Sequence, residues 1–168
     1  VLTLRVLGKS THGAYPHEGI DAIVIAGQLI CALQTIVSRA TDPRDSAVLT
    51  FGTINGGSQN NIVADEVTLT GTLRTLSPKT REMLNDKISQ YVELIPKAMG
   101  GQGILERIKG YPALINHPAW AQLVVDTAIS LLGENSVLEL EKPSMGVEDF
   151  AYFLERVPGA FYQLGCRN

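Results

Sequence analysis

Two histidines, His12 and His17, stand five residues apart in a glycine- and proline-containing segment that covers residues 8–21. The segment lies between an apolar stretch with strand-like alternation and a long apolar stretch with helical spacing. Loops held by rigid elements are where binding and catalytic side chains concentrate. An imidazole there can donate or accept a hydrogen bond, bind a metal ion or change charge near neutral pH. Histidines in surface loops are also commonly just solvated, and the residues alone leave both possibilities open.

Two further polar side chains could bind a substrate. Asn61 follows the Gly56-Gly57 pair, although asparagine is common in turns for backbone reasons. Arg74 comes late in a threonine-rich stretch, where its planar guanidinium group could hold a carboxylate or simply face solvent. Taken singly, each of these residues fits a structural role better than a functional one.

The sequence predicts no metal site of its own. Its histidines, the third of which is His117, lie in unrelated segments, whereas zinc needs three or four converging ligands. The adjacent Glu148 and Asp149 are interpreted as the start of a helix, where acidic side chains favour the positive end of the dipole. No phosphate loop, nucleophile elbow or dinucleotide fingerprint is present in the sequence.

The spacing of apolar residues predicts an α+β fold for residues 1–111. The predicted elements are a strand over 1–7, a helix from 19 or 21 to 39, strands over 46–54 and 61–75, a helix from 77 toward 94, and a strand over 103–111. A glycine-rich turn at 55–58 should join the middle strands into a hairpin. Ser77 and Pro78 should start the second helix, and Pro96 should end or kink it. This order is that of a ferredoxin-like βαββαβ unit, with two helices on a four-stranded antiparallel sheet.

The remaining residues, 112–168, have a different character. We expect a helix from 118 to 132, a strand over 137–140, a helix over 150–156 and a short strand over 160–164. These elements are too few to build a convincing core alone, so they predict part of a second domain. Both ends of the chain look cut, and we expect a fragment of a longer protein.

Composition narrows the functional class. The 168 residues are 45% hydrophobic and 18% charged, with a formal net charge of -3. This charge balance does not indicate a basic surface for binding nucleic acid or an anionic membrane. The longest apolar run, over residues 22–33, is too short to cross a bilayer. Cys31 and Cys166 match no paired-cysteine motif, and no export signal opens the chain, so a reduced, cytoplasmic protein is expected.

Five motifs taken together resemble one family. They are Gly8-Lys9-Ser10-Thr11-His12-Gly13-Ala14-Tyr15-Pro16-His17 with Ile20-Asp21-Ala22, residues 33–39 with Asp42-Pro43, Gly56-Gly57 with Asn61-Ile62-Val63, residues 71–75, and residues 145–150. The set is similar to the lid (dimerisation) domain and the C-terminal part of the catalytic domain of metal-dependent amidohydrolases. These belong to the aminoacylase and carboxypeptidase superfamily, in the branch of hippurate hydrolases, N-acyl-amino-acid amidohydrolases and auxin-conjugate hydrolases. The resemblance covers nearly the whole chain.

The resemblance implies a domain division and a role for each candidate residue. Residues 1–111 would form the lid domain, and residues 112–168 would form part of an incomplete catalytic domain. In the intact parent enzyme a water on a divalent metal ion, zinc or manganese, would attack the amide. His12 would stabilise the developing oxyanion, and Asn61 and Arg74 would bind the carboxylate end of the substrate. His17 would bind substrate, position the loop or cap the following helix.

Two departures from the family pattern also lead to expectations. The family usually has a proline where Ala64 stands, which predicts a looser turn. The family's metal ligands would lie before Val1 and after Asn168, so this fragment should hold no metal and should be inactive alone.

The sequence therefore predicts a fragment of a homodimeric, metal-dependent hydrolase that cleaves the amide bond of N-acyl amino acids, such as hippurate-like conjugates. Its partners would be a small-molecule substrate and a second copy of itself, with no nucleic acid and no membrane. The alternative is a non-catalytic ferredoxin-like dimerisation or small-molecule sensor module, because fold alone does not decide function.

Overall fold

The computed structural model describes residues 1–166 and divides into two compact units, Val1–Lys109 and Gly110–Asn168. The expected boundary lay two residues later, after Tyr111. His12, His17, Asn61 and Arg74 all lie in the first unit.

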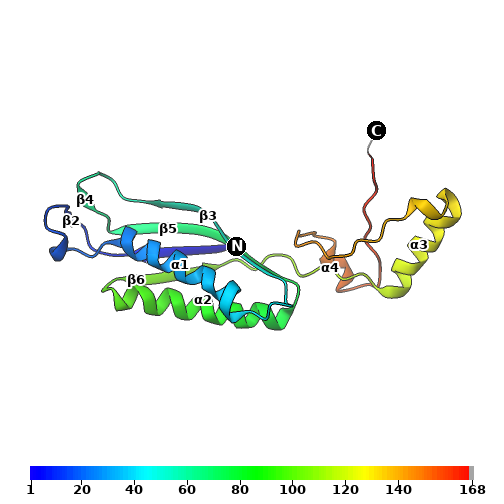
Figure 1. Ribbon diagram of the computed structural model, residues 1–168, viewed down its shortest axis with the longest axis horizontal. Coiled ribbons are helices and arrows are strands. Elements are labelled where there is room, and N and C mark those ends of the chain that lie inside the picture. The colour runs from blue at the N-terminus through cyan, green and yellow to red at the C-terminus, as the bar shows by residue number, and fades with distance from the viewer. Residues whose placement is uncertain (167–168) are drawn as a thin grey trace. The chain divides into compact units, whose positions relative to one another are not determined.

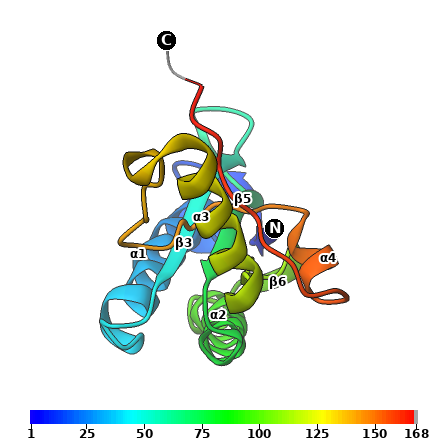
Figure 2. The ribbon, with the colours of Figure 1, turned by 90° about the vertical axis from the view of Figure 1, so that its right-hand side faces the viewer.

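The first unit contains one four-stranded antiparallel sheet with two helices on one of its faces (Figures 1 and 2). Its main elements are β1 Leu2–Leu7, α1 Ala22–Ala40, β3 Ala47–Gly56, β5 Glu66–Thr75, α2 Pro78–Ala98 and β6 Gln102–Arg107. The strand order is β3-β5-β1-β6, so β3 and β6 form the two edges. This confirms the predicted ferredoxin-like βαββαβ layer. The register between β3 and β5 shifts at a bulge between Phe51 and Thr53.

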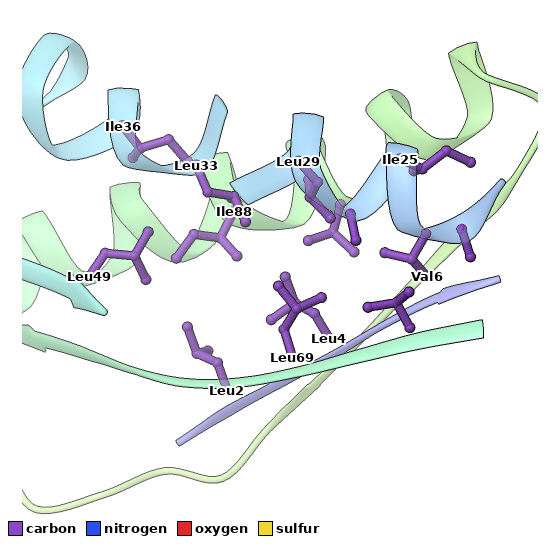
Figure 3. Packing of buried hydrophobic residues seen from close by; sticks show 14 of the residues in the cluster. Leu2, Leu4, Val6, Ile25, Leu29, Leu33, Ile36, Leu49, Leu69 and Ile88 are labelled. Atoms are coloured by element: carbon purple, nitrogen blue, oxygen red, sulfur yellow. The ribbon is translucent and has the colours of Figure 1, made fainter. Parts of the chain in front are cut away.

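Alternation along the central strands builds the core. Leu2, Leu4 and Val6 of β1 are buried, while the residues between them are half-buried on the other face of the sheet. Side chains of α1 and α2 meet these strands from above, as Figure 3 shows. The buried helical residues recur at intervals of three and four, which is the period of one helix face: Ala22, Ile25, Ala26, Leu29, Leu33 and Ile36 in α1, and Leu84, Ile88 and Val92 in α2.

Leu29 lies fully buried in this core, so truncating it should destabilise the first unit. We expect Leu29→Ala to lower the free energy of unfolding by about 2–5 kcal/mol, through lost burial and the cavity left behind. Denaturant unfolding of the 168-residue chain measures this, and Gln28→Ala on the exposed face of α1 is the matched control. A loss below about 0.5 kcal/mol for Leu29→Ala, the size of an ordinary surface effect, would contradict the packing described.

The helix starts are those that the sequence predicted. The Asp21 carboxylate accepts hydrogen bonds from the N–H groups of Ile23 and Val24, and Ser77 Oγ accepts from Thr80 N–H with Pro78 in the first turn. Pro96 does not end α2, which continues to Ala98. Pro96 lacks only the N–H that would donate to the carbonyl oxygen of Val92, and the helix ends two residues later, so one hydrogen bond is lost near its end.

Three predicted strands differ from the structure. The strand expected over 61–75 is two elements, because β4 (Ile62–Val63) pairs with another segment and the main strand begins at Glu66. In the second unit, residues 137–140 and 160–164 form no strand. Short apolar runs become strands only when a partner strand completes their hydrogen bonds, and none pairs with them within the described residues.

The helices of the second unit are α3 (Pro118–Leu132) and α4 (Ala151–Leu154), with a short 3-10 helix at Glu134–Ser136. The helix α4 is shorter than the expected 150–156, and no side chain caps its start. The carboxylate of Glu148 instead accepts a hydrogen bond from Asp149 N–H at 3.1 Å. Trp120, Leu123, Leu131 and Leu132 of α3 are all exposed, which agrees with the prediction that these elements alone make little core.

The helix α1 is long and apolar enough to cross a membrane by length and composition alone. One such helix near the N-terminus is weak support for a membrane span, since the core helix of a globular domain passes the same test. One face of α1 lies in the core just described, as in a core helix of a globular domain.

Candidate functional site

A second, two-stranded sheet brings His12 next to Asn61. The strand β2 (Thr11–His12) pairs antiparallel with β4 (Ile62–Val63), and His12 lies opposite Ile62. The segments that contain β2 and β4 project from the same end of the main sheet (Figure 1). Residues about fifty positions apart in the sequence are thus neighbours.

The base of the histidine loop is closed by backbone hydrogen bonds. Lys9 and Ile20 exchange two N–H···O=C bonds of 2.9 Å, and Gly8 N–H donates to Asp65 O at 2.7 Å. Ala22 N–H donates to the carbonyl oxygen of Ala64 at 3.0 Å, and Ala64 is buried. The contact uses a carbonyl group, which alanine and proline share, so the alanine at this position leaves the turn anchored rather than loose.

His12 begins a four-residue turn that fixes its ring. Tyr15 N–H donates to the carbonyl oxygen of His12 at 2.8 Å, which closes the turn. Ala14 N–H donates to the imidazole Nδ1 of His12 at 3.1 Å. The ring of His12 also lies 6.0 Å from that of Tyr15, measured between centroids. The imidazole is exposed, so its other nitrogen, Nε2, is available to a ligand.

Gly13 couples this turn to Asn61. Its N–H donates to the carbonyl oxygen of Asn61 at 2.7 Å, and a Cβ atom on residue 13 would lie 3.0 Å from that oxygen. Such a contact is tighter than an ordinary van der Waals distance, so the two segments would have to move apart. Glycine at position 13 therefore allows the close approach of the two loops.

We expect Gly13→Ala to lower the activity of the intact enzyme at least about tenfold while leaving its melting temperature nearly unchanged. Small misplacements of catalytic groups are costly to rate, whereas an exposed turn contributes little to the core. Steady-state kinetics beside thermal melts tests this, with Ser10→Ala at an exposed position of the same loop as the control. Unchanged kinetics would show that the spacing of the two loops does not matter.

His17 has weaker structural ties. It lies in a 3-10 helix, Pro16–Glu18, with its side chain 74% exposed, and its Nε2 is 4.0 Å from Oε1 of Glu18. Its ring stands edge-on to Tyr15 at 6.4 Å. The suggestion that it caps the following helix is wrong, because Asp21 caps α1. A substrate-binding or loop-positioning role for His17 stays a prediction.

Arg74 lies far from the other candidates within one chain. It pairs with Val48 near the end of β5, whereas the histidine loop adjoins the beginning of that strand. The seven steps from Val67 to Arg74 span about 23 Å at roughly 3.3 Å per residue. His12 and Asn61 therefore form one cluster, and a single copy of the first unit does not bring Arg74 into it.

An ion pair lies on the sheet face opposite the helices. Nε of Arg5 donates to Oε1 of Glu66 at 2.7 Å, and this hydrogen bond holds the pKa of the Glu66 carboxyl below its usual value. Both side chains are about two-fifths exposed, so the pair contributes little to stability. Within residues 1–166, no three His, Cys, Asp or Glu side chains are grouped closely enough to hold a metal ion.

The sequence interpretation missed the contributions of Ala14 and Tyr15. Ala14 acts through its backbone N–H, which no side-chain pattern reveals, and Tyr15 contacts both histidine rings. The signal available was the placement of Gly13 directly after His12, which favours a turn there.

Known proteins match both the sequence and the fold. Residues 2–99 match the family model of the M20 peptidase dimerisation domain. The N-acetyl-L-cysteine deacetylase of Bacillus subtilis is 41% identical over 162 residues, which are 96% of this chain and 38% of that protein. The N-acetyldiaminopimelate deacetylase of Bacillus licheniformis is 39% identical over 166 residues, which are 98% of this chain and 43% of that protein.

A solved structure shares the fold. The Bacillus subtilis YXEP protein, described as a dinuclear metal binding peptidase from the M20 family, superposes with a TM-score of 0.71 at 24% identity. The match covers 95% of this chain and 39% of that one. The chain thus spans about two fifths of the length of these relatives. With 98 of its 168 residues, positions 2–99, matched by the family model, the chain belongs to the M20 peptidase dimerisation domain family.

Proposed function

We propose that this chain is the lid and an adjoining part of a metal-dependent amidohydrolase that cleaves N-acyl amino acids. The pairing of β2 with β4 carries the proposal, because it brings an exposed imidazole and an exposed asparagine to one two-stranded sheet. The deacetylase relatives act, by their names, on N-acetylated amino acids, which favours a short acyl group over a hippurate-like one. Family membership also favours a hydrolase over a small-molecule sensor.

The residues of this chain would bind and polarise the substrate. Nε2 of His12 would donate a hydrogen bond to the amide oxygen as negative charge develops on it. The side-chain amide of Asn61, and the guanidinium group of Arg74, would hold the free carboxylate of the substrate. A divalent metal, as in the M20 relative described above, would supply an activated water. The described residues do not fit a metal site, so none of them is assigned to the metal.

A second copy of this chain would dock along the edge formed by α1 and β3. The helix α1 carries a second stripe beside its buried face, at intervals of four and three residues: Ile23, Gly27, Ile30, Gln34 and Val37. Ile23 is 51% exposed and lies near Gly57, at the end of β3. No charged residue occurs in α1 before Arg39. Ile30 and Val37 are half-buried against the core, and exposed apolar surface such as that of Ile23 beside them is typical of an interface.

The opposite edge is a poorer candidate. There α2 packs beside β6, and its outward face carries Lys79, Glu82 and Asp86. Charged side chains protect a sheet edge and are depleted from interface cores. Gly27 adds to the argument for α1, because a Cβ atom there would meet nothing within 4 Å in this chain. Glycine weakens a helix by about 1 kcal/mol relative to alanine, so a close approach by a partner explains it better than packing inside the chain.

Gly27→Glu tests this interface without disturbing the fold of one copy. The change improves helix propensity and faces open space in a single chain, but it places a charge within the proposed contact. Light scattering should show a dimer for the unmodified chain and a monomer for Gly27→Glu. Gln90→Glu, on the exposed face of α2, adds the same charge elsewhere and should leave the dimer intact. A monomeric unmodified chain, or a Gly27→Glu dimer, would refute the interface.

This interface would also bring Arg74 to the histidine loop. A two-fold axis relating two β3 edges makes them antiparallel, so the end of β3 beside Arg74 in one copy meets the opposite end in the other. The histidine loop lies at that opposite end. One binding site would then contain His12 and Asn61 of one subunit and the partner's Arg74.

Activity of the intact protein tests the proposal as a whole. The full-length enzyme, loaded with zinc or manganese, should release acetate from N-acetyl amino acids and should be slower with their benzoyl counterparts. Binding of these compounds without turnover would favour the sensor alternative and would refute the proposed hydrolase.

A further inference from the structure

The turn that follows His12 determines which nitrogen of its ring carries the proton. Nδ1 of His12 lies 3.1 Å from the backbone nitrogen of Ala14, which donates to it. An N–H group can donate only to a nitrogen that holds a lone pair. The proton of the neutral ring is therefore on Nε2.

The Ala14 N–H is itself held in place from two sides. The turn is closed by Tyr15 N–H donating to the carbonyl oxygen of His12 at 2.8 Å. Gly13, between the two residues, donates to the carbonyl oxygen of Asn61 at 2.7 Å, and β2 pairs with β4 directly beside it. The donor to Nδ1 is thus anchored by the same contacts that bring His12 next to Asn61.

We propose that Ala14 is a positioning residue whose backbone N–H fixes His12 as a hydrogen-bond donor through Nε2. This rests on the proposed hydrolase function and makes the role of His12 specific. With its proton on Nε2 and Nδ1 occupied, the neutral ring can neither accept a proton from water at Nε2 nor bind a metal through it. It can donate to an oxygen, such as the amide oxygen of a substrate.

Nuclear magnetic resonance of the 168-residue chain, uniformly labelled with 15N, reports the tautomer without any measurement of activity. At mildly alkaline pH, long-range proton–nitrogen spectra should show His12 with its proton on Nε2, together with a 15N–15N coupling between Ala14 N and Nδ1 across the hydrogen bond. A His12 ring that carries its proton on Nδ1, or a missing coupling, would overturn the proposal.

Two substitutions at position 12 divide the functions of the ring in the intact enzyme. His12→Asn can still accept the Ala14 N–H through Oδ1, as asparagine does in turns, but its short side chain places no N–H donor where Nε2 lies. His12→Gln places an amide N–H close to the position of Nε2, but it loses the acceptor for the Ala14 N–H. If donation through Nε2 is the role, His12→Gln should retain at least about tenfold more kcat than His12→Asn, whereas KM should differ little between them.

The two tests separate this proposal from the one on which it rests. Equal or higher kcat for His12→Asn would overturn the donor role of the ring. Full activity in both variants, with the tautomer as expected, would instead refute a catalytic role for His12 and leave the assignment of the tautomer intact.

Discussion

Replacing His12 with alanine in the intact enzyme should lower kcat by roughly a hundredfold to a thousandfold, the range for losing one donor to an oxyanion. KM should change much less, because the carbonyl oxygen of the ground state is a weaker acceptor than the oxyanion of the transition state. The ring is exposed, so its removal leaves no cavity. Steady-state kinetics on an N-acetyl amino acid measures both constants.

A structural explanation predicts a different pattern. If His12 merely stabilised its turn, His12→Ala would lower the melting temperature in step with activity. His17→Ala is the matched control, since it removes a second exposed histidine from the same loop and should reduce kcat far less. A stable His12→Ala enzyme with near-normal kcat would show that His12 is not catalytic.

Mixing two impaired variants should restore activity on a substrate with a free carboxylate if the site is shared between subunits. In a dimer with His12→Ala in one subunit and Arg74→Ala in the other, one site receives both altered residues and the second receives neither. Random exchange makes half of the dimers mixed, and half of their sites are unaltered, so the mixture should recover about a quarter of the unmodified activity. If each site used His12 and Arg74 from one subunit, no mixed dimer would contain an unaltered site.

Controls make this recovery specific. The subunits must first be exchanged, which the Gly27→Glu variant should prevent if α1 forms the interface. Arg74→Ala alone should weaken binding of substrates with a free carboxylate and spare the corresponding amides, because only the carboxylate uses both arms of the guanidinium group. No recovery after proven exchange would place the Arg74 contribution within one chain or outside the site.

Local signals in the sequence were sufficient for the main layer of the first unit. The alternation of β1 and β5, and the helical spacing in α1 and α2, were readable because each pattern extends over six residues or more. Asp21 and Ser77 identified helix starts, since a cap acts on N–H groups within three residues of it. The five motifs also identified the family, because their order along the chain is itself specific, and the family model confirmed it.

Tertiary structure decided what depends on contacts between distant segments. The strands β2 and β4 are two residues each, too short for any periodicity, and they exist only because they pair with each other across about fifty residues. The hydrogen bond from Ala14 N–H to Nδ1 of His12, on which the proposed tautomer rests, lies directly beside this contact. Conversely, the apolar run at 137–140 has strand-like composition but no partner strand among the described residues, and so forms none.

The position of Arg74 and the two faces of α1 show the same limit. Asn61 and Arg74 are thirteen residues apart in the sequence, yet a strand is extended, so β5 carries Arg74 away from the loop. In α1 the sequence shows a long apolar helix, and only packing reveals that one stripe fills the core while Ile23 and Gly27 stay uncovered. A sequence records which side chains are apolar, whereas burial depends on which surfaces the folded chain has already brought together.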